Sequence, residues 1–187
     1  MSYDSIVKQY LKVIKDLKIN HCKASELISQ LSGANIQVEE NEGCEKPQIH
    51  VWSNGRKHFS YLGIPAVNEL WPFLNALLRI STNTVQLDPQ ELDMAKMVRG
   101  NVKLFVTPDC TKCPIAAELL YQVALVNQNV ELEIIDSETY DDLAKKYHVL
   151  SVPKIVLNEK TEIPGGFPPN IVLKMLVKSS SSQGTQP

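Results

Sequence analysis

Two cysteines, Cys110 and Cys113, have the spacing of a dithiol that can close into a disulfide and reopen. They lie in the segment Phe105-Val-Thr-Pro-Asp-Cys-Thr-Lys-Cys-Pro. In disulfide exchange a thiolate attacks a disulfide, and a neighbouring thiol resolves the mixed disulfide that forms. The pair therefore indicates thiol–disulfide chemistry, with Cys110 as the attacking thiol and Cys113 as the buried, resolving one.

The elements predicted on either side place this pair between a strand and a helix. Residues 101–107 read as a buried strand, and Pro108-Asp109 form a turn. The helix that follows has apolar residues at spacings of three and four, namely Ala116, Leu119, Leu120 and Val123. Because the first amides of a helix lack partners and its dipole is positive there, we expect the thiolate of Cys110 to be stabilised.

The other chemistry open to such a pair is metal binding. A structural zinc site needs two further ligands, usually another closely spaced pair. Cys22 and Cys44 stand 22 residues apart, and the four histidines form no ligand pair at helical spacing. We interpret Cys22 and Cys44 as small core or loop residues and predict no metal site.

Composition places the chain among globular proteins. Of its 187 residues, 43% are hydrophobic and 21% charged, and the net charge is −2, which favours neither nucleic acid nor an anionic membrane as a partner. The first residues, Met-Ser-Tyr-Asp-Ser, do not resemble a signal peptide, and no apolar run approaches a membrane span of about 20 residues. We therefore expect a cytoplasmic protein, in a reducing compartment where such a cysteine pair is catalytic more often than structural.

In the first half, the periodicity predicts three helices, a strand and a hairpin. The helices are expected over 2–19, 25–31 and 68–80, the last starting late or kinked at Pro72. A short strand is expected over 35–39. Two alternating runs, 48–52 and 57–62, flank Asn54-Gly55, which is a strong hairpin signal.

The second half is predicted to alternate strands and helices. Asp88-Pro89-Gln90-Glu91 should begin a helix that ends at Gly100. After the cysteine helix we expect a strand over 130–135, a helix capped by Ser137, a strand over 154–157, a turn, a short strand, and a helix over 170–178. Residues 179–187 contain no apolar side chain and are predicted to form a disordered tail.

The two halves repeat each other. Lys46-Pro47-Gln48-Ile49-His50-Val51 parallels Val152-Pro153-Lys154-Ile155-Val156-Leu157, and each motif leads through a hairpin to a closing helix. We therefore predict two tandem units, residues 1–82 without the cysteine pair and residues 83–178 with it, followed by the tail at 179–187.

The second half resembles a thioredoxin fold, with a strand, a Cys-x-x-Cys helix, a strand, a helix, an x-Pro strand, a hairpin and a helix. The predicted fold class is therefore α/β, with two tandem thioredoxin-like units, each a central mixed sheet flanked by helices. In that fold the proline after the second helix has a cis peptide bond and packs beside the disulfide. The resemblance assigns this role to Pro153, which could otherwise be an ordinary proline at a strand edge.

The whole chain resembles the double thioredoxin-fold protein disulfide oxidoreductases, which are called glutaredoxin-like, and the N-terminal domain of the alkyl hydroperoxide reductase flavoprotein. The match includes Tyr61-Leu-Gly63-Ile-Pro65-Ala-Val-Asn-Glu69, which is similar to their Gly-x-Pro-x-Gly-x-Glu segment. There the glutamate lies between the units near the active cysteines, which implies such a place for Glu69. Val67 and Asn68 depart from the pattern, and Glu69 could instead be a simple acid at a helix start.

The resemblance implies an enzyme, a protein-disulfide oxidoreductase active in electron transport and cell redox homeostasis. The chain has no Gly-x-Gly-x-x-Gly motif, so we expect no bound cofactor and a separate reductase, a flavoprotein of the thioredoxin-reductase type. The disulfide partner is expected to be a peroxiredoxin or a client protein. A redox-inactive binding module and a metal-binding protein are the alternatives, and the direction of electron flow is left open.

Overall fold

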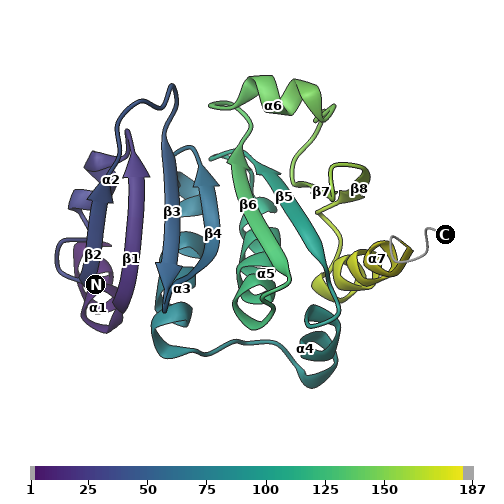
Figure 1. Ribbon diagram of the computed structural model, residues 1–187, viewed down its shortest axis with the longest axis horizontal. Coiled ribbons are helices and arrows are strands. Elements are labelled where there is room, and N and C mark those ends of the chain that lie inside the picture. The colour runs from purple at the N-terminus through teal and green to yellow at the C-terminus, as the bar shows by residue number, and fades with distance from the viewer. Residues whose placement is uncertain (1–2, 183–187) are drawn as a thin grey trace.

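Across the described residues, 3–182, eight strands form one mixed β-sheet in the order β2-β1-β3-β4-β6-β5-β7-β8 (Figure 1). We describe it from a computed structural model. The strands are β1 (Lys15–Cys22), β2 (Asn35–Glu40), β3 (Gln48–Ser53), β4 (Arg56–Leu62), β5 (Gly100–Val106), β6 (Val130–Asp136), β7 (Lys154–Leu157) and β8 (Thr161–Pro164). The helices are α1 (Tyr3–Val13), α2 (Ser25–Ser29), η1 (Val67–Glu69, a 3-10 turn), α3 (Leu70–Thr82), α4 (Pro89–Ala95), α5 (Cys113–Val126), α6 (Asp141–Lys146) and α7 (Pro169–Ser182).

Each half of the chain builds its part of the sheet by the same pairing scheme. In the first half β1 pairs parallel with β2 and antiparallel with β3, which pairs with β4. In the second half β5 pairs parallel with β6 and antiparallel with β7, which pairs with β8. The halves join where β4 pairs parallel with β6, at Ser60–Glu133 through Leu62–Ile135. The predicted fold, two tandem α/β units, is confirmed.

An aromatic and polar interface also joins the halves behind the sheet, where Figure 1 shows α3 beside α5. Phe59 of β4 lies 4.6 Å, between ring centroids, from Tyr121 of α5 and 6.0 Å from Phe73 of α3. Glu118 of α5 accepts a hydrogen bond from Asn75 and forms an ion pair with Arg79. These contacts position the start of α3, and with it η1, against α5.

The helix predicted over 2–19 is correct only as far as Val13. The helix α1 ends at Val13, and residues 15–22 form β1, a central partner of β2 and β3; Ser2 lies outside the described residues. Asp16 has φ 57°, which breaks helical geometry. Beyond it Leu17 and Ile19 alternate into the core, so a strand buries them as well as a helix would.

Other boundaries differ for local reasons. The predicted cap Ser137 does not begin a helix, since α6 starts at Asp141; instead Asp136 accepts hydrogen bonds from the Glu138 amide and the Thr139 hydroxyl. The helix α4 ends at Ala95, before the predicted stop at Gly100. The helix α7 continues to Ser182, so residues 179–182 of the expected tail are helical, and residues 183–187 lie outside the described part.

Three local signals were interpreted correctly. Asn54 and Gly55 have φ of 51° and 74° in the turn between β3 and β4. Asp88 accepts from the amide of Glu91 at 2.8 Å, and the carboxylate of Glu91 accepts from the amide of Asp88 at 3.1 Å, which makes a capping box. Pro72 lies in the first turn of α3, which follows η1 and so begins late.

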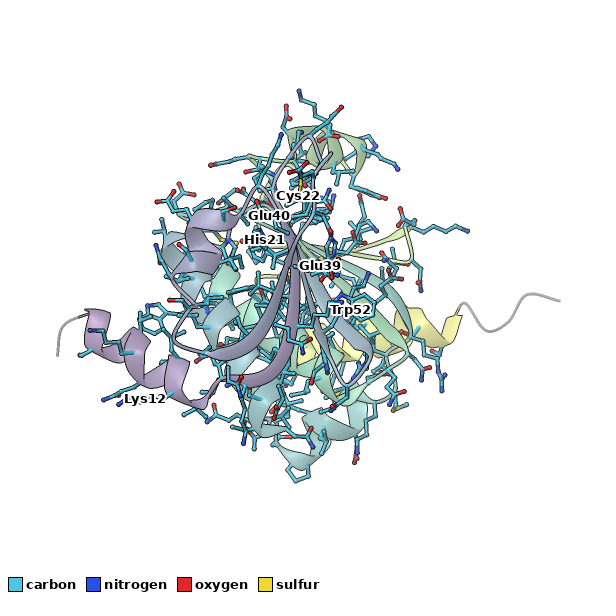
Figure 2. All side chains as sticks on the ribbon, turned by 60° about the vertical axis from the view of Figure 1, so that its left-hand side comes forward. Lys12, His21, Cys22, Glu39, Glu40 and Trp52 are labelled. Carbon is cyan, nitrogen blue, oxygen red and sulfur yellow. A yellow bond between two sulfur atoms is a disulfide. The ribbon has the colours of Figure 1, made fainter. Side chains whose placement is uncertain are left out.

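A disulfide joins Cys22 to Cys44, a pairing that the interpretation of these cysteines as small core or loop residues did not include. Cys22 is buried at the end of β1, beside His21 in Figure 2, and Cys44 lies in the loop between β2 and β3. The same loop is held by Lys23, whose ammonium donates to the carbonyl of Glu45 at 2.9 Å. The bond therefore closes a segment that contains α2 and β2 onto the end of β1.

No helix within residues 3–182 is both long enough and apolar enough to cross a bilayer.

Candidate functional site

The two cysteines of the predicted redox pair are joined by a disulfide at the junction of β5 and α5. Strand β5 ends at Val106 and α5 begins at Cys113, with Cα atoms of the two cysteines 5.5 Å apart. The amide of Cys110 donates to the carbonyl of Thr107 at 3.3 Å, which closes the turn before the helix. Cys110 is half-buried, whereas Cys113 is 0% exposed, so Cys110 is the more accessible cysteine of the pair.

The start of α5 directs a hydrogen-bond donor at Cys110. The amide of Cys113 donates to Sγ of Cys110 at 3.1 Å, and α5 continues for 14 residues behind it. An amide and a helix dipole that point at a sulfur stabilise negative charge on it, which favours Cys110 over Cys113 as the attacking thiol. The nearby charges are less buried: Lys112 precedes the helix and is exposed, and Asp109 accepts from the Thr107 hydroxyl at 2.9 Å.

Pro153 follows a cis peptide bond from Val152, as the resemblance implied. Val152 and Cys110 both pack against the core cluster that contains Cys113. Pro153 is buried, and Gly165 lies against it: a Cβ on that glycine would come within 3.0 Å of Cβ of Pro153. The amide of Gly165 also donates to the carbonyl of Pro153 at 3.0 Å, which fixes the segment that leads into β7.

Glu69 is fully buried, at 0% exposure, where η1 ends and α3 begins. Neither of its carboxylate oxygens has a hydrogen-bond partner among the described residues. Burial, and secondarily the negative charge of Asp136, raises the pKa of Glu69 to about 7. An unpaired buried carboxyl with this pKa can gain or release a proton near neutral pH.

The segment that carries Glu69 is attached directly to the active-site turn. The amide of Asn68 donates to the carbonyl of Pro108 at 3.1 Å, and its side chain donates to the carbonyl of Cys110 at 3.4 Å. The turn η1 also contacts α5. The first unit therefore meets the second at the redox pair, and Asn68, which sequence reasoning noted only as a departure from a pattern, makes that connection.

A second acid, Asp136, was not selected from the sequence. It is buried at the carboxyl end of β6, and Gly63 (φ 120°) lies against it, because a Cβ there would come within 2.8 Å of Cβ of Asp136. Burial and the charges of Glu69 and Asp136 raise the pKa of Tyr61 well above its usual value. The one available signal was an acid directly after the predicted strand over 130–135, since sites often form at the carboxyl ends of strands.

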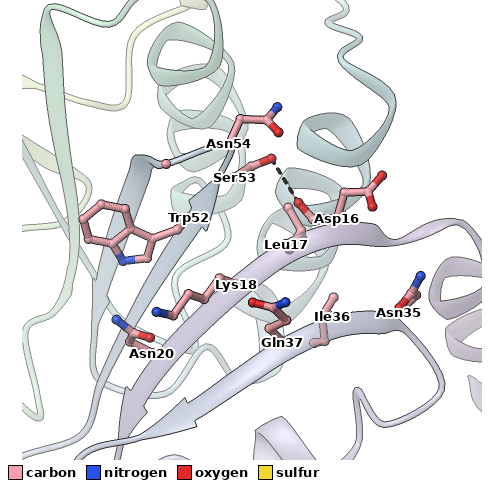
Figure 3. Close-up of a pocket in the computed structure, with 11 residues that line it drawn as sticks. Asp16, Leu17, Lys18, Asn20, Asn35, Ile36, Gln37, Trp52, Ser53 and Asn54 are labelled. Carbon is pink, nitrogen blue, oxygen red and sulfur yellow. Dashed lines mark hydrogen bonds between the residues drawn. The ribbon is translucent and has the colours of Figure 1, made fainter.

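Away from the redox pair, the first unit carries an open cavity of about 500 Å³ beside the β3–β4 turn (Figure 3). Lys18, Asn20 and Trp52 line it, and the Ser53 hydroxyl donates to the carbonyl of Asp16 at its edge. No residue of the disulfide segment lines this cavity. Within residues 3–182 no group of three or more His, Cys, Asp or Glu side chains is arranged to hold a metal ion.

Two family descriptions match the chain in tandem. A thioredoxin-like domain matches residues 3–83, and a thioredoxin domain matches residues 100–178. The crystal structure of Sso1120 from Sulfolobus solfataricus is 52% identical, with a TM-score of 0.82 over 87% of this chain and 99% of that one. The chain belongs to the tandem thioredoxin-like proteins.

More distant tandem thioredoxin-like proteins share the fold. The N-terminal domain of alkyl hydroperoxide reductase AhpF from Enterococcus faecalis is 18% identical, with a TM-score of 0.78 over 94% of this chain and 100% of that one. A protein disulfide oxidoreductase from Aeropyrum pernix K1 is also 18% identical, with a TM-score of 0.75 over 96% and 93%.

Curated relatives of this tandem thioredoxin-like protein are much longer. The AhpF component of alkyl hydroperoxide reductase from Pseudomonas aeruginosa is 27% identical over 100 residues, 52% of this chain and 19% of that protein. A Bacillus subtilis protein described as NADH dehydrogenase is 24% identical over 166 residues, 81% of this chain and 33% of that protein. The chain thus spans a third or less of these relatives.

Proposed function

We propose that this protein is a thiol–disulfide oxidoreductase that exchanges the Cys110–Cys113 dithiol and disulfide with disulfides of other proteins. One observation carries the proposal: the amide of the buried Cys113 donates to the sulfur of the accessible Cys110. This arrangement gives one cysteine the charge and exposure of a nucleophile and keeps the other in reserve.

In the first step, the Cys110 thiolate attacks one sulfur of a partner disulfide. That disulfide breaks, the new bond joins Cys110 to the attacked sulfur, and the other partner sulfur leaves as a thiolate that takes a proton from water. In the second step, Cys113 loses its proton and attacks Sγ of Cys110, which releases the partner's second thiolate. The partner gains two electrons, and the protein ends in the disulfide form described above.

We propose that Glu69 accepts the proton that Cys113 loses in the second step. Its pKa of about 7, raised by burial and by the charge of Asp136, lets its ionised form accept a proton near neutral pH. Its oxygens have no other hydrogen-bond partner among the described residues, and η1 contacts the helix that begins with Cys113. Pro153, whose neighbour Val152 packs against the core cluster that contains Cys113, is assigned the role of shaping the surface against which the partner segment lies.

The oxidised pair must be reduced in trans, and we assign this to a flavoprotein of the thioredoxin-reductase type. These 187 residues carry no dinucleotide-binding glycine motif, so they do not bind a nicotinamide cofactor by that route. The names of its relatives, alkyl hydroperoxide reductase AhpF among them, support electron transfer toward a peroxiredoxin or client protein disulfides. A role in electron transport and cell redox homeostasis in the cytoplasm follows from the same proposal.

The alternatives have less support from the geometry. A redox-inactive binding module would not require an amide that donates to the sulfur of a half-exposed cysteine. A metal-binding protein needs further ligands beside the pair, and within residues 3–182 no suitable group of side chains gathers.

Insulin reduction tests the proposal. The protein with dithiothreitol should precipitate insulin faster than dithiothreitol alone, and the Cys110→Ser variant should not. Adding a thioredoxin reductase and NADPH in place of dithiothreitol tests the assigned electron donor. Equal rates with wild-type protein and with Cys110→Ser would contradict the proposed function.

A further inference from the structure

Val67 occupies a backbone conformation that valine avoids. Its φ is 53°, in the left-handed region, where a β-branched side chain clashes with the backbone. Such a conformation is unfavourable and persists only where the surroundings impose it. Glycine, which has no Cβ, adopts this conformation freely.

Packing within the chain does not explain the valine. Its side chain is 69% exposed, so it contributes little to the core. On its C-terminal side, however, the backbone is fixed: Asn68 donates to the carbonyls of Pro108 and Cys110, and Glu69 is buried. The strained backbone therefore holds an apolar side chain in solvent, one residue away from a direct contact with Cys110.

Other exposed apolar side chains gather on the segments around the disulfide. Of the eight large apolar side chains that are exposed among the described residues, three besides Val67 lie on such segments: Ile115, Leu150 and Phe167. Ile115 is two residues beyond Cys113, and Leu150 shares a cavity wall with Pro153. Phe167 follows Gly166, where an added Cβ would lie 3.8 Å from Cδ of Lys112.

We propose that Val67 is a specificity-determining residue, through which the first unit contacts the polypeptide that presents its disulfide to Cys110. The inference rests on the proposed function and adds the class of substrate: disulfides flanked by an apolar protein segment, in preference to small soluble disulfides. Desolvation of an exposed valine on binding supplies affinity in proportion to the apolar area covered. Replacement by glycine removes both the strain and the contact.

The test compares two disulfides with the pre-reduced protein under single-turnover conditions. Insulin is the protein probe, and bis(2-hydroxyethyl) disulfide is the small probe, which carries no apolar polypeptide segment. We expect Val67→Gly to slow the reaction with insulin about three- to tenfold, a loss consistent with part of a valine contact. The reaction with the small disulfide should stay within about twofold of wild type, because Cys110 and Cys113 are untouched.

Two further variants separate contact from backbone geometry. Val67→Asn places a polar side chain here, on a residue that tolerates the left-handed region. It should slow the reaction with insulin as Val67→Gly does. Val38→Asn changes an exposed valine on β2 in the same way and should change neither rate.

An insulin rate within about twofold of wild type for Val67→Gly would overturn the inference. If Val67→Gly slows the reactions with insulin and with the small disulfide equally, the inference is also overturned, because that result means a general effect on the redox pair. If the wild type reduces the small disulfide but does not prefer insulin, the inference fails and the proposed function stands. If the wild type reduces neither probe, the proposed function fails as well.

Discussion

The backbone amide of Cys113 donates a hydrogen bond to Sγ of Cys110, with 3.1 Å between the nitrogen and the sulfur. The two residues of the redox pair are thereby unequal before any partner arrives. Cys110 lies at the N-terminal end of α5, where the helix dipole is positive, and is partly exposed. Cys113 supplies the amide and is fully buried. Chemical labelling and trapping follow from this inequality.

Brief alkylation of the reduced protein with iodoacetamide near neutral pH should label Cys110 first. The thiolate is the reactive form, and both the amide and the exposure favour it at Cys110. Peptide mapping by mass spectrometry gives the site of the label. Faster labelling of Cys113 would show that the roles of the two cysteines are reversed.

The Cys22–Cys44 disulfide should stabilise the fold without taking part in exchange. It closes a loop with a sequence separation of 22, for which the loss of chain entropy in the unfolded state corresponds to about 3 kcal/mol. Cys44→Ser should lower the free energy of unfolding by about that amount, measured by denaturant unfolding of the oxidised protein. It should leave insulin reduction within about twofold; a rate as low as that of Cys110→Ser would place this disulfide in the active site.

Glu69 should make stability depend on pH. Its folded-state pKa of about 7 lies above the ordinary value of 4.5, so the folded protein holds this proton more tightly than the unfolded chain. The resulting stability is fully present below pH 4.5 and is lost as the pH rises through 7, by about 3 kcal/mol. Glu69→Gln should lack that loss, and denaturant unfolding of the two proteins at several pH values measures it.

The effect of Glu69 is measured as the difference in the free energy of unfolding between wild type and Glu69→Gln at each pH. Burial and the charge of Arg56 lower the pKa of His58 to about 4, so His58 contributes an opposite trend, losing stability as the pH falls from 6.5. That contribution is common to wild type and Glu69→Gln and cancels in the difference. A difference that stays constant from about pH 4.5 to 7.5 would mean that Glu69 is ionised throughout, as a helix-end acid would be.

The same carboxyl should control the second step of exchange. Above pH 7 its ionised form is available to take the proton of Cys113, so the rate of resolution in wild type should rise through that pH. Glu69→Gln cannot accept this proton, and its rate should be lower and rise only with the thiol's own ionisation. Stopped-flow measurement of the release of the reduced partner gives the rate; superimposable profiles would remove Glu69 from the mechanism.

Local patterns predicted the redox site, because its parts are each encoded within a few residues. Cys110 and Cys113 sit between a buried strand and a helix that the apolar spacing marks clearly. The cis bond before Pro153 and the placement of Glu69 came from resemblance; the structure has the cis bond and buries Glu69 where η1 ends.

The features that sequence reasoning missed depend on contacts distant in the chain. Strand β1 continues the apolar stripe of α1, and only its pairing with β2 and β3 makes it a strand. The Cys22–Cys44 bond joins residues whose spacing carries no pairing signal. Ser137 has the type of a helix cap, but its neighbour Asp136 supplies the oxygens that the following turn needs.

Trapping with Cys113→Ser tests the central claim most directly, because it isolates the mixed disulfide between the two steps. The reduced variant is mixed with insulin, quenched with acid and analysed by non-reducing mass spectrometry. We predict a covalent adduct of one insulin chain through Cys110, absent from Cys110→Ser and short-lived in wild type. An adduct through Cys113 in Cys110→Ser, or no adduct in either variant, would contradict exchange that begins at Cys110 and is resolved by Cys113.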